Sequence, residues 1–413
     1  MKNGISLDKN TNEGPHDISS LNQSIMFSRF ETFMTLFDKS EDFKFKKSPN
    51  EAITALGCMS GTSLDGLDLA LVTFTPPSNK NSFWKFYVQS TEFISYSKTG
   101  WEEKLLTAYT LSNKNKVEEI SKKYAQWISL KAKNFLDHLP NNIPQAEIFC
   151  CHGHTIAHNP KMKVTKQIGN TYELTTHLDI PVVCDFRSAD VKRGGQGAPL
   201  VPLADMFLFH EYPICLNLGG FANASWDNKG IRYATDLAPC NIIFNELTKK
   251  IGKSYDENGK LAAQGNVKKK ELNKLNNLSY YNSSIPKSLS WEWAMRHAYP
   301  ILFEIPIIED ALATAAEHCA WAINKGIKEI NAKKIFVTGG GVWNSHLLKR
   351  IGHYFKGEIF VPKKEIVDQK EAICFAFLGI KKLRGEINVL SSVTGGSGDS
   401  SDGTMFVKKV VQK

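Results

Sequence analysis

Residues 56–74 read LGCMSGTSLDGLDLALVTF, in which two apolar runs enclose a loop of glycine, hydroxyl and aspartate residues. The flanking runs AITALGCM and LDLALVTF have the composition of strands in a buried sheet. A plain hairpin needs only one or two special turn residues, so the loop holds more glycines than its turn demands. Where no Cβ blocks the approach, backbone N–H groups can converge on one point and bind a phosphate.

The polar residues of this loop favour the same interpretation. Thr62 and Ser63 supply hydroxyl donors, while Asp65 and Asp68 supply hard oxygen ligands for Mg²⁺, directly or through water. The loop is not a Walker A sequence, because no Gly-Lys-Ser/Thr follows. Taken alone, it fits a glycine-rich hairpin with structural Asx turns equally well, so the remaining segments decide.

The same order of elements occurs twice along the chain. Three strands, a helix, a strand, a helix and a strand form a series that restarts roughly 160 residues later, and each copy opens with a strand that runs into a glycine-rich turn. The predicted strands are 52–59, 67–74, 82–96, 146–153 and 180–186 in the first copy and 213–220, 221–227, 231–237, 333–341 and 357–362 in the second, with long helices at 116–139, 309–330 and 369–383. This duplication predicts an α/β fold of two similar lobes with a cleft between them.

Two further glycine loops lie in the second copy. LNLGGFAN (216–223) contains Gly219, Gly220 and Asn223, and VTGGGVWN (337–344) contains Gly339, Gly340 and Gly341. Each follows a strand and one precedes a helix, and both settings favour anions and close backbone approach. Three such loops in this order indicate two phosphate-binding loops and one adenosine-binding loop for a single nucleotide.

The segment VVCDFRSADVKRGGQGAPLVPLAD (182–205) is the most chemically loaded of the chain. Asp185 follows directly on an apolar strand, so its carboxylate should project from the strand end, where partial desolvation would make it a good general base. Asp190 competes for that role, and spacing alone does not separate the two. Arg187 can grip anions, and the GGQG run around Gln196 brings backbone close to a ligand. A helix cap or an arginine partner is the structural alternative for Asp185.

A third segment, CCHGHTIAHNP (150–160), brings three histidines together: His152, His154 and His158. Their spacing is not H-E-x-x-H and no carboxylate lies among them, which disfavours a metal centre. Hydrogen bonding to a polyhydroxyl substrate, or support of other site residues, is the better interpretation, with His152 as the substrate-binding candidate.

Length and composition narrow the class of protein. A chain of 413 residues exceeds the usual size of one core, so two domains are expected. The net charge is 51 − 42 = +9, and the lysines are scattered, which argues against a nucleic-acid surface. The eight cysteines form no C-x-x-C pair, as expected in a reducing compartment. Since no signal-peptide pattern or membrane-length run occurs, a cytoplasmic protein without a membrane partner is expected.

Taken together, GCMSGTSLDGLDLALV, CHGHTIAHNP, DFRSADVKRGGQGAPLVPL, LNLGGFAN, VTGGGVWN and KEAICFAF resemble, in this order, the anhydro-N-acetylmuramic acid kinases of the sugar-kinase/actin/Hsp70 superfamily. The resemblance covers the chain from residue 53 to its end. It implies two duplicated RNase H-like lobes, as in actin-like ATPases, with a central nucleotide and substrate cleft. Residues 51–200 plus 368–413 would form lobe I and residues 201–367 lobe II, behind a partly disordered extension of residues 1–50.

The resemblance also implies an activity. These kinases open the 1,6-anhydro ring of 1,6-anhydro-N-acetylmuramic acid with water and move the γ-phosphoryl group of ATP to O6, giving N-acetylmuramic acid 6-phosphate for cell-wall recycling. The resemblance assigns the base to Asp185, a carboxylate that assists at the sugar to Glu371, and substrate binding to Asp236. ATP is the expected cofactor, with Mg²⁺ near Asp65, and a homodimer is compatible. The residues assigned to the first ATP loop are Gly61, Thr62, Ser63, Leu64, Asp65, Gly66, Leu67 and Asp68.

One segment departs from the family pattern. Where many members carry Asp-Thr-Gly-Pro-Gly-Asn, this chain has TDLAPCN (235–241), and the loss of glycines would reshape that wall of the cleft. Apart from this departure, two alternatives stay open. One is another sugar kinase or phosphotransferase of the same superfamily, and the other is a non-catalytic nucleotide-binding clamp that regulates a partner.

Overall fold

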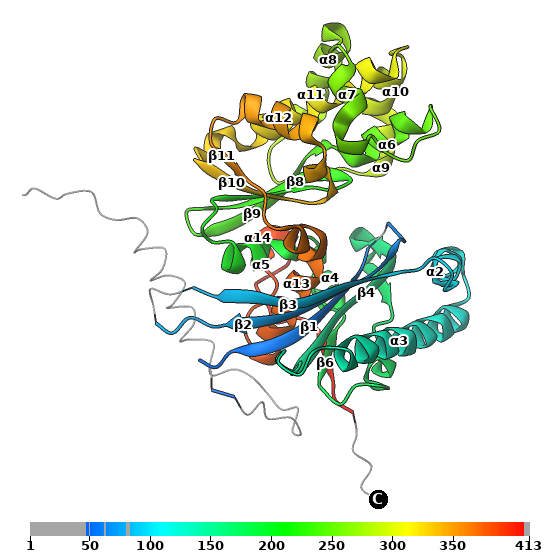
Figure 1. The fold of residues 1–413 in the computed structure, drawn as a ribbon, viewed down its shortest axis with the longest axis vertical. Helices are drawn as coiled ribbons and strands as arrows, with labels where there is room; N and C mark the ends of the chain where they lie inside the picture. The colour runs from blue at the N-terminus through cyan, green and yellow to red at the C-terminus, as the bar shows by residue number, and fades with distance from the viewer. Residues whose placement is uncertain (1–46, 49, 62, 80–82, 409–413) are drawn as a thin grey trace, which may run out of the picture.

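The computed structural model describes residues 47–48, 50–61, 63–79 and 83–408, and these form two lobes around two separate sheets (Figure 1). Nearly all of the predicted extension, residues 1–50, lies outside the described residues, and so does Thr62 of the first glycine loop. The described chain is otherwise continuous through every segment that the sequence singles out, apart from residues 80–82.

Each half opens with three strands, as the sequence predicts, but the helix predicted between the last two strands of the first copy is replaced by a further strand and two short 3₁₀ helices. The strands are β1 Ile53–Ser60, β2 Gly66–Thr75, β3 Lys85–Ser95, β4 Ile148–Asn159, β5 Val164–Ile168, β6 Val182–Cys184, β7 Ile214–Leu218, β8 Phe221–Asn228, β9 Ile231–Pro239, β10 Lys334–Thr338, β11 Glu358–Phe360 and β12 Thr404–Phe406. The helices are α2 Trp101–Thr110, α3 Lys114–Asp137, α4 Ser188–Lys192, α5 Val201–Leu208, α6 Asn241–Lys249, α7 Lys260–Gln264, α8 Lys269–Asn276, α9 Trp291–Trp293, α10 Tyr299–Phe303, α11 Ile308–Ile327, α12 Ser345–Tyr354, α13 Lys364–Leu383 and α14 Ser391–Thr394.

The two sheets share one strand order, which confirms the predicted duplication. The first runs β12-β6-β4-β1-β2-β3, with β5 paired to β4, and the second runs β11-β10-β7-β8-β9. In each sheet three parallel strands (β6, β4, β1 and β11, β10, β7) continue into an antiparallel meander (β1-β2-β3 and β7-β8-β9). This repeated RNase H-like order establishes the α/β, actin-like fold that the sequence predicts. All eight residues of β1 are buried, as expected for a strand covered on both faces.

One helix of the second half crosses back to the first sheet. Helix α13 follows β11 in the chain, yet it packs on β1, β2 and β4 and lies between the two sheets (Figure 1). Helix α5, which leads into the second sheet, contacts α13 together with β8 and β9. The assignment of 51–200 plus 368–413 to lobe I and of 201–367 to lobe II stays a prediction.

The sequence missed several elements and misjudged some ends. Helix α2 was not predicted, and β4 continues past residue 153 into a hairpin with β5. Helix α13 begins at Lys364 rather than at residue 369, and its first turn packs Ile366 and Val367 against the core. All eight cysteines are reduced and buried.

Acid should destabilise the fold through His318, which is buried on α11. Its Nδ1 lies 2.7 Å from Asn276 Oδ1 and its Nε2 lies 2.7 Å from the Tyr281 hydroxyl, while burial lowers the pKa of His318 to about 3. In the unfolded chain the pKa of His318 is about 6.5. Below that pH, His318 binds a proton in the unfolded chain but not in the folded one, so stability falls as the pH falls. Lowering the pH from 7 to 5 should cost about 2 kcal/mol of the free energy of unfolding through this group alone.

The measurement is urea unfolding at pH 7 and pH 5 of wild type, His318→Gln and the control His353→Gln, at an exposed position. His318→Gln should lose less stability between the two pH values than wild type, and His353→Gln should match wild type. Equal losses in all three proteins would contradict the assignment.

Candidate active site

The first glycine loop joins the antiparallel strands β1 and β2. A hydrogen bond of 3.3 Å from Leu64 N to the Gly61 carbonyl closes its turn, and Leu64 has a positive φ of 57°. Ser63 Oγ donates to Asp65 Oδ1 at 2.6 Å, and both residues are exposed. The loop therefore presents a hydroxyl and a carboxylate to solvent, as its sequence predicts.

The start of β2 is held against helix α13. Gly66 and Leu67 are buried within β2, whereas the half-buried Asp68 accepts a hydrogen bond of 3.0 Å from Gln369 Nε2. Burial raises the pKa of Asp68 to about 7; the Gln369 bond opposes this rise and the charge of Asp65 adds to it. Two interacting carboxylates thus lie at one end of β2, next to the exposed loop.

The loops of residues 217–220 and 339–341 meet around Asn241. The Asn241 N–H donates to the Gly219 carbonyl at 3.2 Å, and Asn241 Nδ2 donates to the Leu218 carbonyl at 3.0 Å. A Cβ added to the glycines of residues 339–341 would approach Leu218 or Asn241, the same two residues. The second and third glycine loops therefore form one packed unit.

The remaining residues of this unit differ in exposure. Gly220 and Gly340 are exposed, and Gly341 is buried beneath them. Asn223 is half-buried on β8, where its Nδ2 donates to the Phe221 carbonyl at 3.4 Å. The two exposed glycines are therefore the parts of the unit that a ligand's phosphates could approach most closely.

Asp185 is the first residue after β6. It is half-buried, has a positive φ of 56°, and accepts a hydrogen bond of 2.6 Å from Ser188 Oγ on Oδ1. A positive φ is uncommon for residues other than glycine, although aspartate tolerates it better than most. Backbone held in this way at a strand end is characteristic of functional sites.

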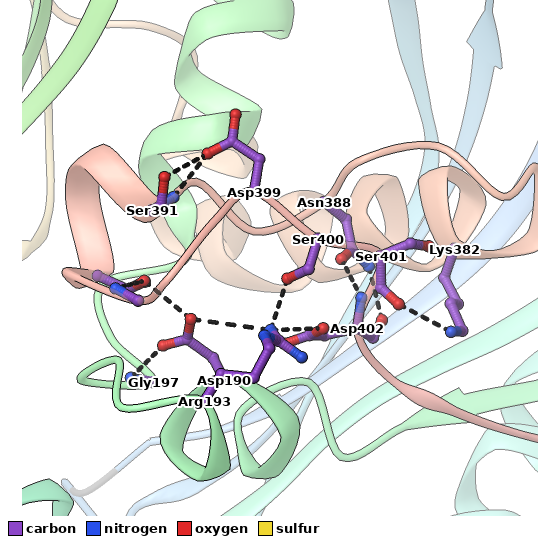
Figure 2. Close-up of polar contacts among 12 residues, drawn as sticks. Asp190, Arg193, Gly197, Lys382, Asn388, Ser391, Asp399, Ser400, Ser401 and Asp402 are labelled. Carbon is purple, nitrogen blue, oxygen red and sulfur yellow. Dashed lines mark hydrogen bonds and ion pairs between the residues drawn. The ribbon is translucent and has the colours of Figure 1, made fainter. Parts of the chain in front are cut away.

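Asp190, the competing candidate, is fully enclosed. Its Oδ2 accepts the Gly197 N–H at 2.7 Å, a bond seen in Figure 2, and its Oδ1 accepts from Thr394 Oγ1 at 2.9 Å. A carboxylate used in this way anchors the chain around it and offers no open side to a water molecule. Of the two aspartates, Asp185 is therefore the one that a substrate can reach.

Arg187, two residues after Asp185 in the chain, forms a pair with His152. Arg187 Nε donates to His152 Nε2 at 2.8 Å, so His152 carries its proton on Nδ1, which donates to the Gly153 carbonyl at 2.8 Å. Burial, aided by the charge of Arg187, lowers the pKa of His152 well below its usual value. Arg187 Nη1 also donates to the Gly197 carbonyl at 2.7 Å. Both ring nitrogens of His152 are engaged, which places it in support of Arg187.

Glu371 lies on α13 with its side chain open to solvent. Desolvation by the surrounding protein nevertheless raises the pKa of its carboxyl, and the positive charges of Arg187 and Lys370 oppose that rise. A carboxylate that is both accessible and poorly hydrated is suited to bind a polar substrate or exchange a proton with it.

Consecutive residues of α13 reach three different parts of the molecule. Gln369 bonds Asp68 beside the first glycine loop, and Lys370 makes a buried ion pair of 2.9 Å with Asp205 of α5. Asp205 in turn accepts from Ser225 Oγ of β8 at 2.7 Å. Helix α13 therefore links Glu371 to elements of both sheets.

The two remaining predicted substrate-binding residues come from different parts of the fold: Gln196 from the segment between α4 and α5, and Asp236 from β9. Gln196 is exposed, and its N–H donates to the Thr394 carbonyl at 2.7 Å. Asp236 is half-buried on β9, where it accepts the Leu289 N–H at 2.7 Å, and burial raises the pKa of its carboxyl. The residue after Gln196, Gly197, accepts a hydrogen bond from Arg187, whereas Asp236 belongs to the second sheet.

Cavities and metal-ligand clusters do not locate the site. A cavity of about 490 Å³ lies between β3 and the end of α3, and one of about 130 Å³ lies beside Leu237 and Gly326; neither is lined by Asp185 or Glu371. In the described part of the chain, no three His, Cys, Asp or Glu side chains gather in a way that could hold a metal ion. The helices described here also include none with the length and apolar content that a membrane crossing needs.

Comparison with known proteins decides the family. Residues 53–408 match the family described as anhydro-N-acetylmuramic acid kinase. Curated relatives of that name are 31% identical in Paramagnetospirillum magneticum, over 86% of this chain and 99% of the relative, and 30% identical in Acinetobacter baylyi, over 85% and 98%. The chain belongs to the anhydro-N-acetylmuramic acid kinase family. It is accordingly a kinase, a phosphotransferase with an alcohol acceptor that uses ATP, and the clamp alternative is not favoured.

Solved structures align less closely. The activator of 2-hydroxyisocaproyl-CoA dehydratase from Clostridium difficile with bound ADPNP is 15% identical, with a TM-score of 0.38, over 80% of this chain and 97% of its own. The fold of this anhydro-N-acetylmuramic acid kinase family member is therefore established by its own two sheets and their shared strand order.

Several site residues of this kinase were not found from its sequence. Asn241, Gln369 and Lys370 each bond a partner far away in the chain, and Thr394 holds Asp190 across 204 residues. Asn241 alone carried a signal, because it survives in the TDLAPCN departure. The others are ordinary polar residues in the sequence, and only the packing of α13 and of the C-terminal segment gives them a role.

The third glycine loop should not tolerate a side chain at its first position. Gly339 has a φ of 84°, and a Cβ there would lie 2.5 Å from Asn217 Oδ1 and 2.8 Å from the Leu218 carbonyl oxygen. Gly252 has a similar φ of 71° with nothing within 4 Å, so Gly252→Ala controls for backbone strain alone.

Gly339→Ala should lower the free energy of unfolding by at least about 1 kcal/mol more than Gly252→Ala, because a backbone clash adds to the strain. Urea unfolding of the two variants measures the difference. Equal losses would mean that the loop can move apart and that the two glycine loops are not one packed unit.

Proposed function

We propose that this kinase hydrolytically opens 1,6-anhydro-N-acetylmuramic acid and phosphorylates its O6 with ATP, giving N-acetylmuramic acid 6-phosphate for cell-wall recycling. Family membership over residues 53–408 supports the reaction class. The observation that carries the residue assignment is Asp185, an accessible carboxylate held at a strand end with positive φ, beside Arg187.

The proposed reaction requires a base. Water adds to the anomeric carbon as the bond from that carbon to O6 breaks, and the water's proton passes to Asp185. The released O6 bonds to the γ-phosphorus while the bond to the ADP oxygen breaks. Because the transferred group demands little covalent help, positioning and charge neutralisation supply most of the catalysis.

The other groups of the site divide between sugar and nucleotide. Glu371 would contact the sugar, and Arg187 would provide a positive charge near the departing oxygen. The glycines of the three loops, at 61, 219–220 and 339–341, would hold the phosphates and adenosine through backbone N–H groups. Gln196 and Asp236 would contact the sugar from the two sides of the site.

Mg²⁺ fits the residues at the start of β2. Kinases usually hold this ion with one or two carboxylates plus phosphate oxygens and water, so no complete protein cage is required. Asp65, exposed at the first loop, would hold the ion directly or through water, with Asp68 behind it. When bound, the ion neutralises charge on the phosphate oxygens.

The setting of the protein also belongs to the proposal. The eight buried, reduced cysteines support a reducing compartment, and ATP is available in the cytoplasm. A homodimer and a surface that avoids nucleic acid stay predictions from the sequence.

Asp185→Asn should abolish turnover while ATP binding persists, because the amide cannot accept the water's proton. The substrate is 1,6-anhydro-N-acetylmuramic acid with ATP and Mg²⁺, and mass spectrometry should find a wild-type product that has gained one phosphate and one water. Asp179→Asn, at an exposed aspartate bound to Lys408, is the matched control and should keep wild-type activity.

Normal turnover of Asp185→Asn would refute the assigned base. A wild-type enzyme that phosphorylates other sugars in a panel, but not the anhydro sugar, would instead favour a different sugar kinase of the superfamily.

Asp65→Asn should raise the Mg²⁺ concentration needed for half-maximal ADP release by roughly tenfold, the loss expected when a charged partner of the ion is removed. Binding of ATP with and without Mg²⁺, measured by calorimetry, supplies a second readout. Asp137→Asn, at an exposed aspartate on α3, is the control. An unchanged Mg²⁺ dependence would move the ion away from Asp65.

A further inference from the structure

The structure carries a cluster of polar contacts between the Asp190 region and residues 388–402, here called the C-terminal strap (Figure 2). We propose that Thr394 of this strap is a positioning residue for sugar turnover, which it supports by fixing the loop that holds Arg187, two residues after Asp185 in the chain. The proposal rests on the proposed function, and it assigns Thr394 no contact with the substrate.

Hydrogen bonds hold the two ends of the strap together. Asn388 is fully buried; its Nδ2 donates to the carbonyls of Leu378 and Asp402, at 3.1 and 2.8 Å, and its Oδ1 accepts the Asp402 N–H at 2.7 Å. Val389 and Ser400 pair as an antiparallel bridge. The segment between them is therefore a closed loop with a fixed base.

Thr394 connects the loop of the strap to the active-site region through two hydrogen bonds. Its hydroxyl donates to Asp190 Oδ1 at 2.9 Å, and its carbonyl accepts the Gln196 N–H at 2.7 Å. Asp190 Oδ2 accepts the Gly197 N–H at 2.7 Å. A Cβ on Gly195 would lie 2.1 Å from Asp190 Oδ2, so the GGQG run wraps tightly around this carboxylate.

Further hydrogen bonds connect this loop to Arg187. The Gly197 carbonyl accepts from Arg187 Nη1 at 2.7 Å, and Arg187 Nε donates to His152 Nε2 at 2.8 Å. The contacts therefore run in series from Thr394 through Asp190 and Gly197 to Arg187, two residues from Asp185. Each link is a hydrogen bond that involves a charged or buried group, and such bonds are the stronger ones.

A second set of contacts also joins the strap to the region of Asp190. Arg193 Nη2 donates to Asp402 Oδ2 and to Ser400 Oγ, each at 2.6 Å, and the Asp402 carboxylate is buried (Figure 2). This ion pair joins the end of α4 to the strap. Because it bypasses Gly197, it should keep the strap in place when the Thr394 hydroxyl is removed.

The test compares Thr394→Val, which removes the hydroxyl at nearly constant volume, with Thr394→Ser, which restores it. Thr175→Val is the matched control, since Thr175 is equally buried and its hydroxyl donates only to the Tyr172 carbonyl. Thr394→Val should lower kcat/KM for the anhydro sugar by at least roughly tenfold, with KM for ATP within about twofold of wild type. Thr394→Ser should recover most of the loss, and Thr175→Val should show none.

Hydrogen–deuterium exchange gives a readout that needs no turnover. The amides of Gln196 and Gly197 should exchange faster in Thr394→Val than in wild type and Thr175→Val. Faster exchange with an inactive wild type would refute the proposed function and leave the link to the loop standing. An active wild type whose Thr394→Val keeps its sugar kcat/KM would overturn the positioning role. So would failure of both Thr394→Val and Thr394→Ala to fold, because Thr394 would then be a structural residue.

Discussion

The close approach of α13 to β1 is the constraint on which the site depends. The two backbones pack so tightly that a Cβ on Gly57 would lie 1.9 Å from the Ala372 carbonyl oxygen. Only glycine permits this contact at the centre of the first sheet, and it brings the turn of α13 around residues 369–371 beside the end of β1. Gln369, Lys370 and Glu371 owe their positions to it, although their helix follows a strand of the other sheet.

The same helix makes the two lobes depend on each other. The Lys370–Asp205 ion pair is buried on both sides, and Asp205 passes the connection to Ser225 of β8. Breaking one partner of a buried pair typically costs about 3–5 kcal/mol, because the remaining charge is left without compensation. A movement of one lobe against the other must therefore pivot around this pair or carry α13 along. Glu371, the carboxylate proposed to contact the sugar, is the next residue on the same helix.

The sequence predicted the repeated strand order and those site residues whose position follows from their neighbours in the chain. The duplicated strand order was visible because apolar runs and glycine turns recur at a fixed spacing, and Asp185 was visible because it follows a strand directly. Asp185 and Asp190 could not be separated, because their roles come from burial. Asp190 is enclosed by Gly197 and Thr394, and Thr394 is 204 residues away in the chain. Gln369 meets Asp68 across 301 residues, and no local pattern announces such a pair.

The TDLAPCN departure shows where a change of sequence can be absorbed. Leu237 and Cys240 are buried, and they face the core of the second lobe. Leu237 packs against α11 at Gly326, where an added Cβ would lie 2.3 Å from its Cδ2, and the Cys240 thiol contacts that of Cys319 on the same helix. The larger side chains therefore extend the core behind β9 instead of filling the wall of the site. Asp236 and Asn241, the polar residues that survive, keep their contacts on the other side, so the loss of glycines leaves the proposed nucleotide loops joined through Asn241.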